Sequence, residues 1–592
     1  MTMRFKHILL IIIAGAMGLN VMAQRDSIIN MESEFEGERK LFLRDANKLT
    51  TNPVIKEQMV EMVTIRYSTL PTRKTVLIEP KPILPAKINV EEKLAKLYRG
   101  YARAGYGTYG TVPADFYFTD GRSKKGTYGV HYHLLRSSGL NLNDGDTIPD
   151  RFSDNKIELW GKKFLKKTIL EGCLDWERNV SHWYGFDNTR YTSSDVVMDS
   201  LRQRLNTFGG HASYKTFDRD SADLNYRFDL AIRNTTDLYN GRETNVDWVA
   251  FASKLINTEL FSGEIGMNYN SFGYTGPDIG RFGVPILDED GIRDRKYDNA
   301  VIRFVPMAQT IWRDLRAKVG MGLYIEARGD NPGHFYPLAE VSYNLLDGLI
   351  VPYAGVRGSV EPTTYLGLYR ENPFIQTFPD LRNRNNKLEG YGGIGGAISK
   401  TVSFNAGVNY NSWENFAYFV NDSLNFSDTV TTFYRSVGNK FTIIYDNLKA
   451  LNFHGELAIY SGEKWKANIR GDYYQYTEGN EVHAWHQPSL KFTASGQYKL
   501  KDKFTVSMDL FYVGSRWAKS LVPVQDVERE PDGSYHFKLN GYTDANIMVE
   551  YRYNKRLSAW VQMNNAFALK YQRWSAYNNQ QFLGIMGVTY AF

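Results

Sequence analysis

The sequence has one cysteine, little net charge, and no long apolar run after residue 23. The single Cys173 excludes a disulfide framework and a cysteine-rich metal site. A membrane-spanning helix needs about 20 consecutive apolar residues, so helical spans are excluded beyond residue 23. The net charge of +6 over 592 residues is mild, and the charges are interspersed. The sequence therefore predicts no nucleic-acid partner.

Aromatic residues, in contrast, are abundant. They make up 14% of the chain and include 40 tyrosines, yet the mean hydropathy is −0.42. This combination fits either a soluble protein or a β-barrel, whose strands need an apolar residue only at every second position.

The N-terminus has the pattern of a secretory signal peptide. Arg4 and Lys6 precede a short apolar stretch over 8–19, and Val21-Met22-Ala23 supplies small residues before a cleavage site at Gln24. We therefore predict a signal peptide over residues 1–23.

Residues 24–95 lack sustained alternation of apolar and polar positions. They contain a charged stretch over 32–44 and a proline group at Pro80, Pro82 and Pro85. We interpret this segment as a periplasmic N-terminal extension, and residues 96–592 as the barrel.

From about residue 97 onward, apolar residues recur with period two, which is typical of strands. The segments 224–233, 402–410, 464–473, 503–510 and 557–563 each place apolar residues on one face and polar residues on the other. A soluble sandwich also alternates. However, these segments run to roughly 10–15 residues, longer than the usual 5–6 of soluble strands, and the polar face is often charged, as expected for a watery lumen.

Short and long connections also alternate along the chain. Tight turns are predicted at 347–348, 400–401, 462–463, 501–502 and 554–555, and long connections near 363–387, 420–438, 478–486, 519–536 and 569–580. This is the pattern of outer-membrane barrels, with short periplasmic turns and long extracellular loops. The sequence thus predicts an all-β, transmembrane antiparallel β-barrel of about 22 strands, with the N-terminal extension and C-terminus in the periplasm of a Gram-negative cell. We assign the aromatic groups near strand ends (Trp183-Tyr184, Tyr473-Tyr474 and Trp560) to the interfacial girdle of such a barrel rather than to a carbohydrate platform.

The last strand resembles the C-terminal signal that barrel-assembly machinery recognises in outer-membrane proteins. Gly587, Tyr590 and Phe592 match that pattern, whereas Ile585 stands where a polar residue is usual. The resemblance implies this machinery and outer-membrane lipid as partners.

Three C-terminal segments are similar to the barrel of TonB-dependent receptors, above all those of Bacteroidetes. They are 447–457, 542–553 and 563–567 with the following Tyr571 and Trp574. That family has 22 strands and an N-terminal plug of well over a hundred residues. Residues 24–95 are too few for a full plug. Because a barrel this wide leaks unless something occupies it, we expect this extension, the outer loops or a separate protein to fill the lumen, and we favour the extension as at least a partial plug.

No motif predicts chemistry. Gly390 to Gly395 satisfies G-x-G-x-x-G, but another strand follows where a dinucleotide site needs a helix. Residues 288–291 lack the first ligand of a calcium loop. His131 and His133 share one strand face, which predicts a lumen-facing polar pair, and no nucleophile motif occurs. We expect no enzyme activity, cofactor or metal.

Two functions remain at this point. The first is a transporter or receptor of the TonB-dependent type that passes or binds an unidentified nutrient, with TonB or a separate periplasmic protein as a further partner. The second is a plug-less barrel that serves as a scaffold for periplasmic or surface proteins.

Overall fold

The computed structural model describes residues 98–592, apart from residues 122, 140–149, 186–200, 218–222, 277, 280–284, 287–292, 330, 423–437, 463 and 525. The expected signal peptide (1–23), the N-terminal extension (24–95) and the calcium-like segment (288–291) lie outside the described residues.

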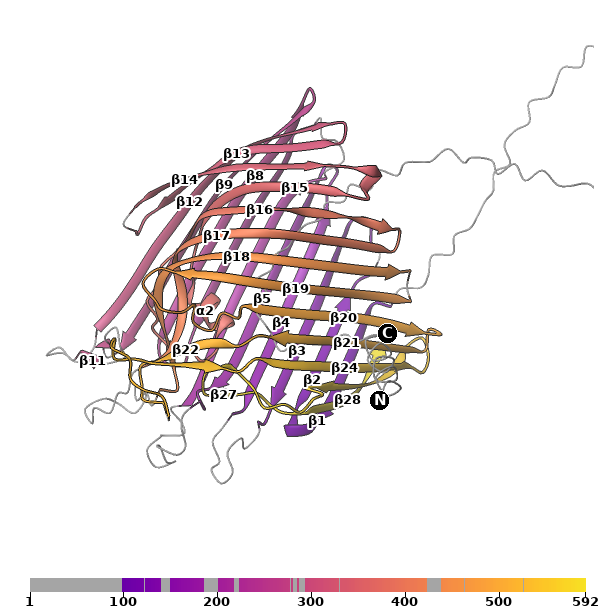
Figure 1. Ribbon diagram of the computed structural model, residues 1–592. Coiled ribbons are helices and arrows are strands. Elements are labelled where there is room, and N and C mark those ends of the chain that lie inside the picture. The colour runs from indigo at the N-terminus through magenta and orange to yellow at the C-terminus, as the bar shows by residue number, and fades with distance from the viewer. Residues whose placement is uncertain are drawn as a thin grey trace, which may run out of the picture. The chain divides into compact units, whose positions relative to one another are not determined.

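Twenty-two antiparallel strands form one closed barrel (Figure 1). The first half comprises β1 (Gly100–Gly107), β2 (Val112–Thr119), β3 (Gly126–Ser137), β4 (Phe152–Phe164), β5 (Thr168–His182), β6 (Arg202–Thr216), β7 (Asn225–Thr236), β8 (Gly241–Ile256), β9 (Glu259–Gly276), β12 (Arg293–Trp312) and β13 (Leu315–Glu326). The second half comprises β14 (Gly333–Tyr343), β15 (Val351–Glu361), β16 (Arg384–Ser399), β17 (Val402–Asn421), β18 (Phe441–Ser461), β19 (Trp465–Glu478), β20 (Leu490–Leu500), β21 (Phe504–Val513), β24 (Tyr542–Arg552), β25 (Leu557–Asn564) and β28 (Leu583–Ala591).

The remaining elements are small and belong to connections between barrel strands. They are the 3-10 turns η1 (Thr108–Gly110) and η3 (Leu346–Gly348), helix α2 (Tyr365–Glu371), and the hairpins β10 (Asp278–Ile279) with β11 (Pro285–Ile286), β22 (Arg516–Ser520) with β23 (Tyr535–Leu539), and β26 (Gln572–Trp574) with β27 (Tyr577–Asn578). Among the described residues, no helix is long and apolar enough to cross a membrane.

Alternation along each strand separates an apolar outer face from a polar lumen. On β13, Val319, Met321, Leu323 and Ile325 are exposed on the outside, although all are apolar. The intervening Tyr324 and Glu326 face the lumen, where Arg303 and Tyr324 are cross-strand partners. An apolar face of this kind is what a strand turned toward lipid requires.

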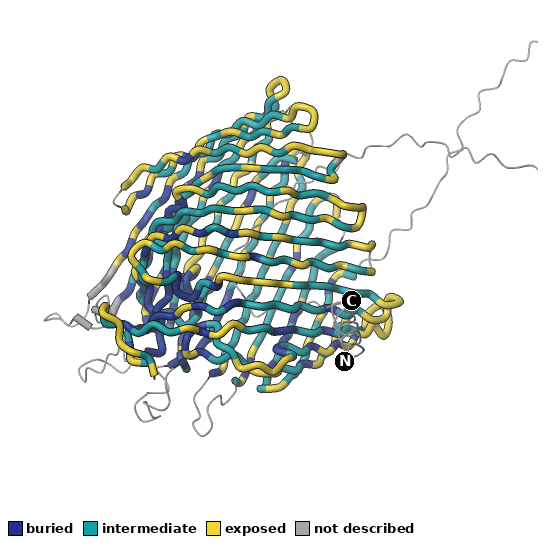
Figure 2. The backbone as a smooth tube through the Cα atoms, viewed as in Figure 1, coloured by how far each residue is buried: buried dark blue, intermediate teal, exposed yellow. Residues whose placement is uncertain are grey.

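The predicted strand number and turn pattern are confirmed. Every tight turn predicted above joins two barrel strands at one end, which we call the turn end. The long connections gather at the other, which we call the loop end. Buried residues concentrate at the loop end (Figure 2). The core of the described residues therefore lies in the loops rather than at the middle of the barrel.

The barrel closes where β1 pairs with β28. The backbone of Phe592 accepts hydrogen bonds from the Arg99 and Gly100 N–H groups and donates one to the Gly100 carbonyl. At mid-seam, Gly105 lies opposite Gly587, and Trp560 of β25 packs its ring over both glycines. Trp560 is 2% exposed and faces the lumen, so its assignment to the girdle was wrong.

Candidate functional site: a closed mouth

The connection between β15 and β16, residues 362–383, folds across the loop end, and we call it the mouth loop. Its only helix is α2, which Figure 1 shows inside the outline of the barrel. Thr364 precedes the helix with an extended backbone, and its hydroxyl accepts a hydrogen bond from the Gly367 N–H at 3.0 Å. This capping satisfies one of the unpaired N–H groups at the helix start.

A carboxylate on the barrel wall holds the start of α2. Glu243 of β8 accepts hydrogen bonds from the N–H groups of Tyr365 and Leu366 at 2.6 and 2.9 Å. Asn270 of β9 orients this carboxylate through a further hydrogen bond at 3.0 Å. Negative charge at a helix N-terminus is favourable because the unpaired N–H groups point outward there. Glu243 is 2% exposed, so this contact is shielded from water.

The other end of α2 contacts β5. Arg370 donates to the Glu177 carboxylate at 2.7 Å, and Tyr369 hydrogen-bonds Ser181 at 3.2 Å. Glu177 is 2% exposed and Arg370 is half-exposed, so the buried carboxylate depends on this cation. Breaking such a pair from one side leaves an unpaired buried charge. The helix is thus fixed at both ends to strands several positions away from β15 and β16 in the barrel order.

Beyond α2, the mouth loop reaches β18. Ile375 forms a parallel bridge with Phe441, and the backbone of Phe441 exchanges hydrogen bonds with Phe374 and Gln376 at 3.0 and 2.9 Å. The Gln376 side chain donates to Thr442 at 2.8 Å. The mouth loop therefore connects β5 and β8 with β18.

A second connection, residues 565–582 between β25 and β28, meets the mouth loop. The rings of Phe374 and Tyr577 stack with centroids 3.5 Å apart. The Tyr577 hydroxyl donates to the Asn439 carbonyl, and Trp574 packs edge-on against Phe419 and Phe441. The two connections thus share one aromatic cluster, with fully buried members Leu205, Phe272, Tyr365, Ile375, Phe419 and Phe441.

Asp237, in the turn between β7 and β8, is a buried acid within this closure. Its carboxylate accepts hydrogen bonds from the Tyr365 hydroxyl at 3.2 Å and from the Gln203 amide at 3.4 Å. The N–H groups of Tyr239 and Gly241 donate to its other oxygen at 2.9 and 2.7 Å. Burial outweighs these four donors and raises the pKa of Asp237 to about 7.

This pKa predicts a pH-dependent closure. The docked loop favours protonated Asp237, so its contribution is complete below the ordinary pKa near 4 and is lost as pH rises through about 7. We expect the open fraction to grow with pH, by at most about tenfold per unit between these limits. Channel conductance measured from pH 5 to 8 checks this. Asp237→Asn should flatten the profile, and an equally steep profile in that variant would contradict the assignment.

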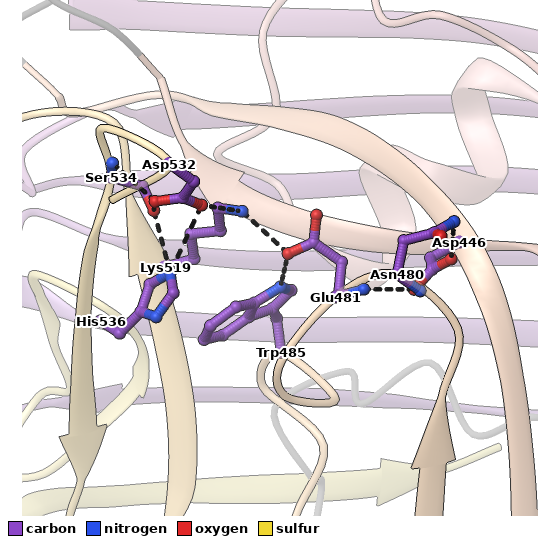
Figure 3. Close-up of polar contacts among 8 residues, drawn as sticks. All are labelled: Asp446, Asn480, Glu481, Trp485, Lys519, Asp532, Ser534 and His536. Carbon is purple, nitrogen blue, oxygen red and sulfur yellow. Dashed lines mark hydrogen bonds and ion pairs between the residues drawn. The ribbon is translucent and has the colours of Figure 1, made fainter. Parts of the chain in front are cut away.

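The β22–β23 hairpin forms a second, polar cluster at the loop end (Figure 3). Lys519 of β22 lies between Glu481 and Asp532, with nitrogen–oxygen distances of 2.8 and 3.0 Å. The Trp485 indole N–H donates to Glu481 at 2.8 Å. Burial alone would raise the pKa of Asp532, but hydrogen bonds from Ser534 and the charge of Lys519 hold it well below its usual range. Lys519 therefore joins the hairpin to the β19–β20 connection.

The β19–β20 connection is also fixed to the barrel strand beside it. Asp446 of β18 accepts hydrogen bonds from the N–H groups of Asn480 and Glu481, both at 2.7 Å. Figure 3 shows Asp446 and Lys519 on opposite sides of Glu481. Glu481 is thus held through its backbone by the wall and through its side chain by the hairpin.

Replacing Lys519 by Met is expected to release the hairpin while leaving the barrel intact. The variant leaves Glu481 without its cation, and Lys519 itself is nearly buried. We expect hydrogen exchange over 479–486 and 516–539 to accelerate by roughly tenfold, the factor that corresponds to one charged hydrogen bond. Hydrogen-exchange mass spectrometry checks this, with Lys449→Met on the neighbouring β18 as the control. Unchanged exchange in Lys519→Met would contradict a linking role for the cation.

Below the mouth, the lumen wall carries a polar cavity of about 310 Å³ over β12–β16. Its lining includes Tyr324, Tyr336, Arg357 and Glu389. Arg357 and Glu389 form a two-pronged ion pair with nitrogen–oxygen distances of 2.8 and 2.7 Å. A solute that enters the lumen therefore meets charged and phenolic groups here.

The structure separates the residues that the sequence singled out. His131 and His133 face the lumen as predicted, where they contact Glu158 at 3.1 Å and Asp115 at 2.6 Å. Gly390 to Gly395 lies within strand β16 and packs against neighbouring strands. Gly587, Tyr590 and Phe592 lie along β28 and its end, away from the mouth. In the part of the chain that the structure describes, no group of three or more His, Cys, Asp or Glu side chains is arranged to hold a metal ion.

The residues that close the mouth were missed by sequence analysis. Glu243 and Tyr365 are separated by 122 positions, and no local pattern connects them. Trp183 was assigned to the girdle, yet it is 1% exposed and stacks on Tyr239 inside the loop-end core. Tyr473, in contrast, is 45% exposed on the outer face, as expected of a girdle residue.

Comparison with known proteins identifies the fold through structure alone. No protein-family model matches the chain, and no curated protein matches it by sequence. The siderophore receptor PirA from Acinetobacter baumannii matches with a TM-score of 0.62 and 10% identity, over 85% of this chain and 81% of that one. The ferripyoverdine receptor of Pseudomonas aeruginosa matches with a TM-score of 0.60 and 13% identity, over 84% and 72% of the two chains.

The FrpB iron transporter from Neisseria meningitidis matches with a TM-score of 0.61 and 11% identity, over 84% of this chain and 82% of that one. These neighbours are receptors and transporters, and this chain shares their barrel fold. The protein therefore has the fold of a closed antiparallel β-barrel of 22 strands, similar to the barrels of these TonB-dependent receptors.

Proposed function

We propose that this protein is an outer-membrane receptor that binds a small nutrient at the loop end and passes it through the barrel. The observation that carries the proposal is the closure of the mouth by the loop 362–383, which is fixed to β5, β8 and β18 through individual side chains. A permanent scaffold needs no such device, and the neighbouring structures favour a receptor over the scaffold alternative.

The remaining assignments follow from this proposal. The turn end faces the periplasm, as short turns do in such barrels, together with the C-terminus and residues 24–95. Gly587, Tyr590 and Phe592 form the signal for the barrel-assembly machinery. The chain carries out no chemical reaction, and TonB or a separate periplasmic protein drives release of the nutrient.

Uptake by a deletion strain tests the proposed function. The strain should lose uptake of one labelled solute from a panel, and we would begin the panel with ferric siderophores because the neighbouring receptors bind or carry iron compounds. Complementation with the wild-type chain should restore uptake. Glu243→Gln should alter the uptake rate, whereas Lys449→Met, a variant of β18 outside the mouth contacts, should not. Unchanged uptake across the whole panel in the deletion strain would argue against a transport role.

A further inference from the structure

Pairs of adjacent, exposed basic residues stand on one side of the turn end. Three turns, β2–β3, β4–β5 and β24–β25, lie beside the seam between β1 and β28. In contrast, Arg313 and Lys501 in the β12–β13 and β20–β21 turns each stand beside an aspartate, and the β14–β15 turn over 344–350 has no lysine or arginine. The exposed pairs in the three turns form what we call the basic arc: Lys124, Lys125, Lys166, Lys167, Lys555 and Arg556.

Among the described residues, no neighbouring side chain neutralises the charges of the basic arc. None of its six side chains forms an ion pair with a residue that the structure describes. Other surface lysines of the barrel do form them, as Lys162 does with Glu171 at 3.2 Å. A lysine in contact with water normally costs little free energy, but adjacent like charges repel one another. The basic arc is therefore a surface that an anion would stabilise.

The basic arc borders the lipid-facing surface of the barrel. Tyr128, Leu165 and Tyr553 are next to it and are 59%, 42% and 63% exposed. Arg556 lies near the Tyr590 side chain and interacts with it electrostatically. Tyr590 lies on the outer face of β28 and is 45% exposed. Long basic side chains beside an apolar band place their charge at the height of lipid headgroups.

We propose that the basic arc binds the headgroups of anionic glycerophospholipids in the leaflet at the turn end. Lysine and arginine attract acidic lipid surfaces over about one Debye length, and the apolar band beside the arc accommodates the acyl chains. A soluble acidic protein would gain nothing from that band. The proposal depends on the outer-membrane location but on neither the nutrient nor the transport role.

Native mass spectrometry of the full-length protein in mixed micelles tests the proposal. With equimolar phosphatidylglycerol and phosphatidylcholine, the wild type should retain phosphatidylglycerol preferentially. The variant K166Q/K167Q/K555Q should lose this preference by at least about fivefold, the factor contributed by one basic residue beside an anionic surface. The variant K166R/K167R/K555R should keep it, because its charge is unchanged.

The matched control removes the same charge elsewhere at the turn end. Lys254, Arg313 and Arg316 are exposed there, outside the basic arc, so K254Q/R313Q/R316Q should retain the preference. An equal loss in this control would show that only net charge matters and would overturn the proposal. Equal retention of both lipids by the wild type, or displacement of phosphatidylglycerol by lipid A or inorganic phosphate, would also overturn it. Heat-modifiable migration in gels verifies that each variant is folded.

Discussion

Replacing residues 363–381 by a short glycine-serine linker is expected to change the protein from a closed to an open channel in planar bilayers. This segment carries α2 and every mouth-loop contact with Glu243, Glu177 and Phe441 described above. A barrel of 22 strands is too wide for its own side chains to fill. Without the segment, Tyr577 loses the Phe374 ring on which it stacks.

A second deletion separates this closure from any contribution of the N-terminal extension. We would compare the full chain, the linker variant, a chain without residues 24–90, and the double variant. Stepwise conductance in the linker variant, but not in the chain without residues 24–90, assigns the closure to the mouth loop. If only the double variant conducts, either segment closes the lumen without the other, and the mouth loop is one of two redundant closures. A closed double variant would assign the closure to the remaining loops.

Single substitutions should reproduce part of this effect. Glu243→Ala removes the acceptor for two helix N–H groups, and unmade buried hydrogen bonds cost about 1–3 kcal/mol each. We therefore expect brief openings rather than a permanent channel. Glu389→Ala, which removes a carboxylate of the lumen wall away from the mouth loop, is the matched control and should leave the closed state unchanged.

The strands could be predicted from the sequence because period two is a local signal. Each strand alternates along its own length, and each tight turn reverses the chain at a predictable end, as at 400–401 and 501–502. The mouth could not be predicted in this way. Its contacts join residues far apart in the chain, 66 positions for Gln376 and Thr442 and 122 for Glu243 and Tyr365. A carboxylate on a polar strand face has the same sequence pattern whether it faces water or a helix start.

Trp560 shows where the available signal was overlooked. In the segment 557–563, the outward positions are Leu557, Ala559, Val561 and Met563. Position 560 alternates with them and therefore points into the lumen. The girdle assignment relied on residue type and proximity to a strand end, and the strand period contradicted it. The structure confirms the period, because Trp560 is buried inside the barrel. For an aromatic residue within a barrel strand, its position in the period-two pattern is therefore a stronger criterion for girdle or lumen than its residue type.

Gly587→Ala is expected to prevent stable closure of the barrel. A Cβ atom at this position would lie 2.3 Å from the Ala104 carbonyl oxygen and 2.3 Å from the Trp560 ring. The backbone oxygen cannot move without breaking the β1–β28 pairing, so overpacking should cost about 1–3 kcal/mol or more. The matched control is Gly455→Ala on β18, where an added Cβ meets nothing within 4 Å. Heat-modifiable migration in gels measures the folded fraction of each variant.

A third glycine variant distinguishes packing from recognition by the assembly machinery. Gly105 lies opposite Gly587 on β1, and its added Cβ would lie 2.6 Å from the Trp560 ring and 2.8 Å from the Met586 carbonyl oxygen. Gly105 is not part of the C-terminal pattern. If the barrel fails to close in both Gly105→Ala and Gly587→Ala, the glycines are required because Trp560 and the two strands occupy the space that a Cβ atom would need. If only Gly587→Ala fails, and does so in cells but not on refolding in detergent, the position is required by the assembly machinery.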